Sequence, residues 1–427
     1  MASVVGVAHG MARSRRSVVQ FIVAAALVLV LGACAQEPTA PAGEPVGVIA
    51  QPLAAGYYHN CGLTGSGAAY CWGWNLDGAL GIGSITPDFF RVPVAVSGGM
   101  SFTAITANVG HTCALTSSGA AYCWGFRFGD GLITNSSIPV AVSGGVRFTT
   151  IAAGESHTCA LTRSGAAYCW GFNHYGQLGD GSTTHRPTPV AVSGGLSFTT
   201  IAAGANHTCA LTRSGAAYCW GSGGSIPVAV SGELTFTTLT AGEGHTCGLT
   251  SSGSAYCWGR NATGQLGDGS TTSRSSPVAV AGGLSFSALA AGSGLDGRAH
   301  TCALTSSGAA YCWGADGLGA STRDLCGPPH DPEEIACNRT PVAVSGGLTF
   351  STLVVGSFHT CGLTAAGSAY CWGGNGWGQL GTGSTENSFV PVAVAGGLSF
   401  GDFAADPNRT CRELRSGCKT RTPARDR

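Results

Sequence analysis

The sequence predicts an all-β fold, a seven-bladed β-propeller whose blades have four strands each and one hairpin held by a disulfide. Three observations predict it. The phrase His-Thr-Cys-Ala-Leu-Thr-Ser-Ser-Gly-Ala-Ala-Tyr-Cys-Trp-Gly recurs, with variations, seven times. Successive copies begin 38 to 59 residues apart, a period typical of circular or stacked repeats. The chain also has 69 glycines and no helical periodicity of useful length.

Each copy has the pattern of a β-hairpin whose two cysteines face each other. In the second copy, two alternating segments flank the turn Ser-Ser-Gly at residues 117–119. A three-residue loop that ends in glycine pairs Cys113 directly with Cys123. Opposed residues of antiparallel strands lie about 4.5–5.5 Å apart at Cα, which a disulfide accepts. The predicted hairpin disulfides are Cys61–Cys71, Cys113–Cys123, Cys159–Cys169, Cys209–Cys219, Cys247–Cys257, Cys302–Cys312 and Cys361–Cys371.

Zinc binding is the alternative role for these cysteines. Two cysteines ten positions apart, with one nearby histidine, match none of the usual short-spaced ligand pairs. One histidine precedes the first cysteine of every copy, which indicates a repeated structural hydrogen bond at a strand start rather than a metal-binding ring. Asp180 and Asp268 each offer a single carboxylate, so turns are expected there and not calcium sites. We expect neither a metal nor a cofactor. The histidines are His59, His111, His157, His207, His245, His300 and His359.

The N-terminal segment predicts export. Residues 13–16 hold three arginines, residues 18–31 form an apolar run, and Leu-Gly-Ala-Cys then ends at Cys34. This ending resembles a bacterial lipobox, which implies cleavage before Cys34 and acylation of its thiol. Ordinary cleavage that leaves Cys34 unlipidated is the alternative. The predicted divisions are a signal peptide (1–33), a lipid-anchored flexible spacer (34–46), the propeller (47–400), and a degenerate eighth repeat with a basic tail (401–427).

Cysteine usage agrees with export, because disulfides persist outside the reducing cytosol. We therefore expect the chain in the bacterial cell envelope, in the periplasm or lipid-anchored to the outer membrane. Its only contact with a membrane would be the N-terminal lipid. Cys326 and Cys337 of an insertion form a further predicted disulfide, whereas the pairing of Cys411 and Cys418 is left open. Whether the eighth copy closes the ring is also left open.

Each repeat contains four predicted strands, named A to D. Strand A is a phrase such as residues 148–153, strands B and C form the hairpin, and strand D is a Pro-Val-Ala-Val segment such as residues 189–192. Units of this length favour a closed propeller over a linear β-solenoid, whose coils are usually shorter. Charged residues make up 10% of the chain and the net charge is zero, which favours neither nucleic acid nor an anionic membrane surface. We expect a monomer.

Segments that follow the Trp-Gly pairs carry a family likeness. Residues 170–181, 258–269 and 372–383, with the upstream Ala-Ala-Gly-x-x-His-Thr phrase, resemble the repeat of the regulator of chromosome condensation family. The resemblance covers about residues 47–400 and implies a seven-bladed propeller. Family members range from a nuclear guanine-nucleotide exchange factor to a secreted bacterial inhibitor of β-lactamases, so the resemblance implies a binding platform and not one activity. The fourth copy departs from the pattern, because residues 222–225 replace its Gly-Gln-Leu-Gly loop.

One face of the propeller is the predicted binding surface. The A–B and C–D loops emerge together on one face and differ in every copy, whereas the B–C and D–A turns are nearly constant. Aromatic residues and arginine dominate binding hot spots. The alternative is that several of these residues only cap loops or plug the channel. The candidate residues are Tyr57, Tyr58, Trp74, Phe126, Arg127, Phe128, Glu155, His174, Tyr175, Asn206, Glu243, Arg260, Asp296, Arg298, Phe358 and Trp377.

The insertion at residues 315–339 is a second candidate recognition element. A polar loop closed by its own disulfide is ordered in advance, which reduces the entropy lost on binding. A tolerated surface insertion is the alternative. Its candidate residues are His330, Asp331, Glu333 and Glu334.

These observations predict a non-enzymatic, extracytoplasmic scaffold that binds a protein or a glycan. The 21 carboxylates are scattered, and there is no His-Glu-x-x-His motif, phosphate loop or serine elbow. Three alternatives are kept. The family implies a guanine-nucleotide exchange regulator, the channel could hold a hydrolase or lyase site, and the chain could be a purely structural surface component.

Overall fold

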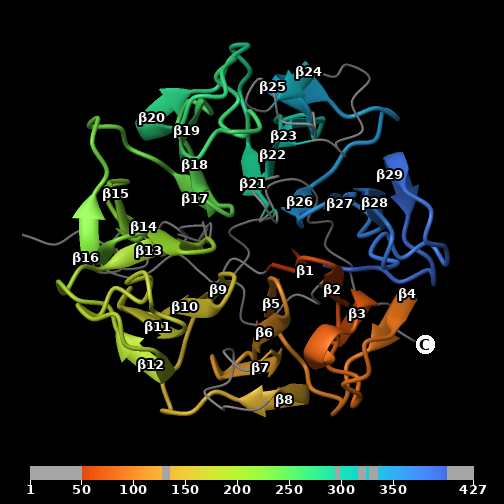
Figure 1. Cartoon of the computed structure of the whole chain (residues 1–427). Helices are drawn as coiled ribbons and strands as arrows, with labels where there is room; N and C mark the ends of the chain where they lie inside the picture. The colour runs from red at the N-terminus through yellow and green to blue at the C-terminus, as the bar shows by residue number, and fades with distance from the viewer. Residues whose placement is uncertain are drawn as a thin grey trace, which may run out of the picture. The chain divides into compact units, whose positions relative to one another are not determined.

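The computed structural model describes residues 51–126, 135–292, 294, 299–315, 324–326 and 335–401. The chain divides into two units, Met1–Glu44 and Pro45–Arg427, and every described residue belongs to the second. In that unit, seven antiparallel sheets follow one another around a ring (Figure 1). The predicted seven-bladed propeller is confirmed. Within the described part of the chain, no helix has the length and apolar character needed to cross a membrane.

Blades 1 to 4 are four-stranded meanders. Blade 1 contains β1 (Leu53–Ala55), β2 (His59–Leu63), β3 (Ala69–Trp74) and β4 (Phe89–Ala95), with the 3-10 turn η1 (Leu76–Gly78) before β4. Blade 2 contains β5 (Ala104–Ala107), β6 (His111–Leu115), β7 (Ala121–Gly125) and β8 (Ser136–Ala141). Blade 3 contains β9 (Thr150–Ala153), β10 (His157–Leu161), β11 (Ala167–Gly171) and β12 (Arg186–Ala191). Blade 4 contains β13 (Phe198–Ala203), β14 (His207–Thr212), β15 (Ala217–Gly221) and β16 (Gly224–Ala229).

Blades 5 to 7 repeat this order, and blade 6 has one strand more. Blade 5 contains β17 (Thr238–Ala241), β18 (His245–Leu249), β19 (Ala255–Gly259) and β20 (Arg274–Ala279). Blade 6 contains β21 (Ala288–Ala291), β22 (His300–Leu304), β23 (Ala310–Ala315), β24 (Asp324–Cys326) and β25 (Ile335–Ala343). Blade 7 contains β26 (Thr352–Val355), β27 (His359–Leu363), β28 (Ala369–Gly373) and β29 (Ser388–Ala393).

The hairpin formed by strands B and C has the predicted register in every blade. In blade 2, Cys113 pairs with Cys123, and Gly119 closes the turn at a φ of 77°, a left-handed conformation that glycine adopts without steric cost. The two cysteines lie 4.1 Å apart at Cα, slightly closer than expected, and the same distance recurs in all seven hairpin disulfides. The prediction of one disulfide-linked hairpin in each blade is confirmed.

The core of the propeller lies between the blades. Each seam packs the disulfide of one blade against a phenylalanine and a tryptophan of the next, for example Cys61 and Cys71 against Phe102 and Trp124. The Phe and Trp ring centroids are 5.6–6.0 Å apart in all seven blades. The tryptophans of the Cys-Trp-Gly phrases are therefore core residues.

The ring is closed by residues 398–400, the Leu-Ser-Phe phrase with which the eighth copy begins, just before the predicted division at residue 401. Phe400 packs on Trp72 of blade 1, in the position that Phe102 takes on Trp124 in blade 2. A β-bridge joins Thr64 to Phe400, and the innermost strand β1 contacts its counterparts β5 and β26 on both sides. This answers the question left open above, because a segment from each end of the chain completes blade 1. Residues 402–427, with Cys411 and Cys418, lie outside the described residues.

The insertion in the sixth copy adds a fifth strand that the repeat pattern did not predict. β24 pairs with β25 on the outer edge of blade 6, and a disulfide joins Cys326 to Cys337. An extended segment beside an unpaired outer strand satisfies main-chain groups that would otherwise face solvent. His330, Asp331, Glu333 and Glu334 lie outside the described residues.

Candidate functional site: the A–B and C–D loop face

Main-chain hydrogen bonds place the A–B and C–D loops of each blade side by side. The amide of Trp74 donates to the carbonyl of Tyr58 at 2.9 Å in blade 1, and Gly374 donates to Phe358 at 2.7 Å in blade 7. The B–C and D–A turns also lie side by side, since the amide of Phe102 donates to the carbonyl of Gly67 at 2.9 Å. The variable loops of the repeat are therefore gathered together, apart from the constant turns.

Five predicted residues from blades 1 and 7 form one cluster, the aromatic patch, which a sixth residue extends. Its members are Tyr57, Tyr58, Trp74, Phe358 and Trp377, with Phe89 at the edge. Tyr58 is at the centre, with ring centroids 4.2 Å from Trp377 and 5.4 Å from Trp74. Trp74 and Trp377 are stacked at 6.0 Å. Such ring pairs stabilise by about 0.5–1.5 kcal/mol beyond their area burial.

The members of the aromatic patch differ in exposure. Tyr57 is buried, with 3% of its surface exposed, and supports Tyr58 and Phe358 from beneath. Tyr58, Trp74, Phe358 and Trp377 are half-buried, and Phe89 is 46% exposed. Of the five predicted residues, four can therefore contact a partner while Tyr57 holds them in place.

Sequence reasoning missed Phe89, although a signal was present. At the same place in blades 3, 5 and 7 stand His185, Ser273 and Asn387, whose side chains accept hydrogen bonds from the amides of an asparagine in the C–D loop. A phenylalanine cannot accept such a bond. Its presence in blade 1 exchanges a loop-capping group for exposed apolar surface beside Trp74.

The remaining described candidates lie on other blades and do not join the aromatic patch. In blade 3, Phe172 stacks on His185 at 4.5 Å, and Tyr175 is 44% exposed beside His174. Burial raises the pKa of Glu155 in the A–B loop of this blade. Phe126 follows β7 in blade 2, and Asn206 precedes β14 in blade 4. Arg127, Phe128, Asp296 and Arg298 lie outside the described residues.

In blade 5, two of the described candidate residues, Glu243 and Arg260, form an ion pair. The Arg260 guanidinium lies 3.2 Å from the Glu243 carboxylate, and both side chains are partly exposed. Because solvent screens such a pair, it contributes at most about 1 kcal/mol to stability.

The C–D loops of blades 3 and 5 are rigid turns that use their carboxylates internally. Asn173 accepts a hydrogen bond from the amide of Leu178 at 2.9 Å, and Asp180 accepts one from Arg186 at 2.9 Å. Partial burial raises the pKa of the Asp180 carboxyl, but hydrogen bonds from Ser182 and Arg186 lower it more, so this pKa is below its ordinary value. Asp268 is held in the same way by Ser270 and Arg274. No group of three metal-ligating side chains occurs within the described residues.

Six of the seven repeated histidines are buried and His207 is half-buried, and all seven join neighbouring blades. Each Nε2 lies 2.8–3.2 Å from a hydroxyl of the next blade, or from Asn60 Oδ1 where the ring closes. In blade 4, the Thr208 hydroxyl donates to the carbonyl of Gln177 at 2.9 Å. That hydroxyl must therefore accept from His157 Nε2–H, which fixes the neutral tautomer. Burial lowers the histidine pKa values to about 3 or 4. The expected structural hydrogen bond is found, and it spans the blades.

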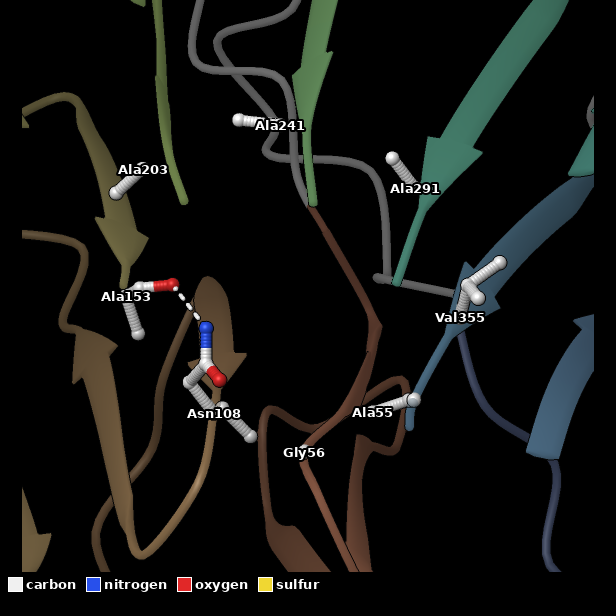
Figure 2. A pocket seen from close by; sticks show the side chains of 10 residues that line it. Ala55, Gly56, Asn108, Ala153, Ala203, Ala241, Ala291 and Val355 are labelled. Atoms are coloured by element: carbon white, nitrogen blue, oxygen red, sulfur yellow. Dashed lines mark hydrogen bonds between the residues drawn. The ribbon is translucent and has the colours of Figure 1, made fainter. Parts of the chain in front are cut away.

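The central cavity offers no reactive groups. It has a volume of about 90 Å³ and is lined by the ends of the innermost strands, mostly alanines (Figure 2). Its one polar side chain, Asn108, donates to the carbonyl of Ala153 at 3.0 Å (Figure 2). A second cavity beside the inner strands has threonine, alanine and aliphatic walls with Gln51. Neither lining contains a carboxylate, histidine or free thiol.

Comparison with known proteins defines the class of protein that this ring represents. Two family models of the regulator of chromosome condensation repeat match the chain. One matches residues 164–211, 252–304 and 366–404. The other matches residues 53–79, 102–126, 148–177, 198–225, 236–265, 297–320 and 350–379. Together they cover more than half of the sequence, and the chain belongs to the regulator of chromosome condensation repeat family.

Relatives in this family share short stretches of sequence with the chain. The ultraviolet-B receptor UVR8 of Arabidopsis thaliana is 31% identical over 137 residues, which cover 31% of this chain and 28% of that protein. The secretion-regulating guanine nucleotide exchange factor of Bos taurus is 38% identical over 86 residues, covering 20% and 18%. The chain therefore spans less than a third of the length of these relatives.

Solved structures confirm the fold. Prp20p of Saccharomyces cerevisiae, from a study of its binding to Gsp1p and histones, superposes with a TM-score of 0.65 at 20% identity, covering 83% of this chain and 88% of that one. Human WBSCR16 superposes with a TM-score of 0.66 at 19% identity, covering 77% and 94%. At these identities the likeness concerns the propeller alone.

Proposed function

We propose that this protein is a non-enzymatic scaffold outside the cytoplasm that binds a protein partner through the aromatic patch. The single observation that carries the proposal is the convergence of Tyr58, Trp74, Phe358 and Trp377 on one face at the seam of blades 1 and 7. Rigid aromatic side chains supply large contact area at a low cost in conformational entropy, which is why they dominate hot spots.

The compartment follows from the disulfides. Eight are formed within the described residues, and seven of them hold the blade hairpins, which indicates maturation in an oxidising environment. The proposed location is the bacterial cell envelope, with a monomer tethered by a lipid on Cys34. Guanine-nucleotide exchange on a cytosolic GTPase is disfavoured for the same reason.

Two further points support binding over catalysis. The linings of the two cavities near the axis contain no carboxylate, histidine or free thiol. In addition, the yeast protein with the same fold is described by its binding to Gsp1p and histones, so a propeller of this type can serve as a protein-binding platform.

The test compares three forms of the purified, tagged, oxidised chain in capture experiments with envelope extract after crosslinking. The unmodified chain is expected to enrich one or a few proteins. The double variant Tyr58→Ala, Trp377→Ala should lower that recovery at least tenfold, since two hot-spot side chains each contribute about 2 kcal/mol or more. Tyr175→Ala, an exposed aromatic on blade 3, is the matched control and should retain it.

Equal recovery with the double variant would contradict the proposal. Loss of recovery on treating the extract with glycosidases would assign the patch to a glycan instead of a protein.

A further inference from the structure

The strongest unassigned feature is a pocket between blades 4 and 5. It has a volume of about 340 Å³ and is lined by residues of blades 4 and 5, which lie across the ring from blades 1 and 7 (Figure 1). Its walls include the Cys209–Cys219 disulfide, Val228, Thr246 and Trp258. An inference about this pocket is independent of the proposed function, because the two sites share no residue.

The pocket exists because the C–D loop of blade 4 is missing. In blade 3, residues 172–185 connect the paired Gly171 and Arg186, whereas only Ser222 and Gly223 connect Gly221 and Gly224 in blade 4. With φ angles of 51° at Ser222 and 110° at Gly223, these two residues form a tight hairpin turn that cannot reach the seam.

Four other seams show what a loop does at this place. Leu178 of blade 3 is fully buried between the Cys159–Cys169 disulfide and Trp220 of blade 4. The carbonyl that precedes this leucine accepts two hydrogen bonds, from the Trp220 indole at 3.0 Å and from the Thr208 hydroxyl at 2.9 Å. Three other carbonyls accept an equivalent pair of hydrogen bonds. Ala79 accepts from Trp124 and Thr112, and Gln265 accepts from Trp313 and Thr301. Gln379 accepts from Trp72 and Asn60.

The seam between blades 4 and 5 keeps the donors and lacks the acceptor. Trp258 is 93% buried, being 7% exposed, and no described residue accepts a hydrogen bond from its indole nitrogen. The Thr246 hydroxyl lies 2.9 Å from His207 Nε2 and 3.5 Å from the Cys209 sulfur, and among the described residues no main-chain carbonyl accepts a hydrogen bond from it. The indole of Trp258 lines the pocket, where an acceptor that displaces water would form a hydrogen bond of about 0.5–1.5 kcal/mol.

The apolar part of the seam is uncovered as well. Cys219 is half-buried although the other hairpin cysteines are fully buried. Val228 is 61% exposed, whereas Val190 of blade 3 is packed against the cluster that contains Leu178. The pocket between blades 4 and 5 thus has the same kinds of wall residue as the site that Leu178 fills between blades 3 and 4.

We propose that this pocket binds a turn of a partner polypeptide that presents a main-chain carbonyl followed by Leu-Gly, in place of the lost loop. The carbonyl would accept from Trp258 Nε1–H and Thr246 O–H, and the leucine would cover Cys219 and Val228. Glycine is required next, because a Cβ on Gly179 of the blade 3 loop would lie 2.7 Å from the indole nitrogen of Trp220. A small apolar molecule would use the cavity but leave both donors unsatisfied, so a peptide is favoured.

The test uses a head-to-tail cyclic peptide that copies residues 173–182 of blade 3, and a control peptide with alanine in place of the leucine. Binding to the purified, oxidised chain is followed by the NMR signal of the Trp258 indole N–H, identified by its loss in Trp258→Phe. We expect a saturable downfield shift with the leucine peptide and at least tenfold weaker binding of the control. Trp258→Phe, followed by calorimetry, should bind about tenfold more weakly because one hydrogen bond is lost.

A chain in which residues 172–185 of blade 3 replace Ser222 and Gly223 fills the pocket with its own loop and should not bind the peptide. The proposal is overturned if the leucine peptide gives no saturable shift at millimolar concentration, if the alanine peptide binds equally well, or if the filled chain binds as the unmodified chain does. Saturation of the pocket by 3-methylbutan-1-ol without binding of either peptide would assign it to small apolar molecules. The affinities of the leucine and alanine peptides are compared on the unmodified chain, so this comparison does not depend on the folding of a variant.

Discussion

At the scale of single residues, the most repeated feature is a buried neutral histidine that donates to the next blade. Removal from water disfavours the charged imidazolium, and the neighbouring His111 and His207 add repulsion at His157. At Thr112, Thr208 and Thr301, a main-chain carbonyl accepts from the hydroxyl and so fixes the histidine as the donor. The histidines therefore act as neutral donors that fix the spacing of the seams.

This ring of histidines predicts a pH dependence of stability. These histidines have a pKa of about 6.5 in the unfolded chain and about 3 or 4 in the folded chain. Below pH 6.5 the unfolded chain therefore binds protons that the folded chain does not bind, which favours unfolding. Stability should be level above pH 7 and decline between pH 6.5 and pH 5, where carboxylates are still ionised. Each histidine lowers the free energy of unfolding by about 1.4 kcal/mol for each pH unit of acidification once its unfolded form is protonated.

Denaturant unfolding at pH 8, 7, 6 and 5, with the disulfides intact, measures this dependence. A free energy of unfolding that is constant or rises from pH 7 to pH 5 would contradict the account of the histidines.

Sequence reasoning anticipated a structural role for these histidines but not their partners. The cysteine partners are ten residues away on the same hairpin, so alternation alone sets their register. The partner of His157 is Thr208 in the next copy, and a contact across 51 residues depends on how blades pack. Local patterns do not contain that information.

At the scale of strands and loops, the closing segment is the element on which the ring depends. Phe400 fills the blade 1 core with 1% exposure and lies against Gly62, where a Cβ would approach its ring at 2.6 Å. Phe400→Ala should lower the free energy of unfolding by about 3–5 kcal/mol, the usual cost of a large cavity. Phe389→Ala is the matched control at 46% exposure and should change stability by less than about 0.5 kcal/mol.

Chemical denaturation of both variants checks this prediction. Similar small losses for the two would mean that the first residues of the eighth copy do not close the ring.

The hairpin disulfides make a second prediction at this scale. Closing a loop of about ten residues restricts the unfolded chain by about 2–3 kcal/mol. The double variant Cys113→Ala, Cys123→Ala should therefore be less stable by about that amount and still fold. Its thermal unfolding midpoint, compared with that of the unmodified chain, measures the loss, and an unchanged midpoint would contradict a structural role for the bond.

Elements that depart from the repeat were the ones that sequence alone could not place. The insertion was expected to form a loop, and part of it pairs as β24 with β25 because an outer strand has free main-chain groups. The missing loop of blade 4 was evident from residues 222–225. Its consequence, a pocket lined by Trp258, depends on the neighbouring blade and became visible only in the packed ring.

At the scale of the whole molecule, closure creates the candidate site. Tyr58 and Trp377 are separated by most of the chain, yet their ring centroids are 4.2 Å apart because blades 1 and 7 are neighbours. Seven copies and a propeller prediction implied that adjacency, and the divergence of the loops indicated the face. Which candidates join the patch could not be predicted from the sequence. Glu155 and Tyr175 belong to the same two types of loop as the patch residues, yet they lie on blade 3.

The account rests on blades that are each locked by facing cysteines in a chain that matures outside the reducing cytosol. Alkylation of the denatured but unreduced protein, followed by peptide mapping, tests this most directly. The predicted result is that the sixteen paired cysteines stay unmodified, and that fourteen of them appear in peptides linked across ten positions. Fourteen reactive hairpin thiols, or zinc in stoichiometric amount, would contradict both the compartment and the role assigned to the repeat.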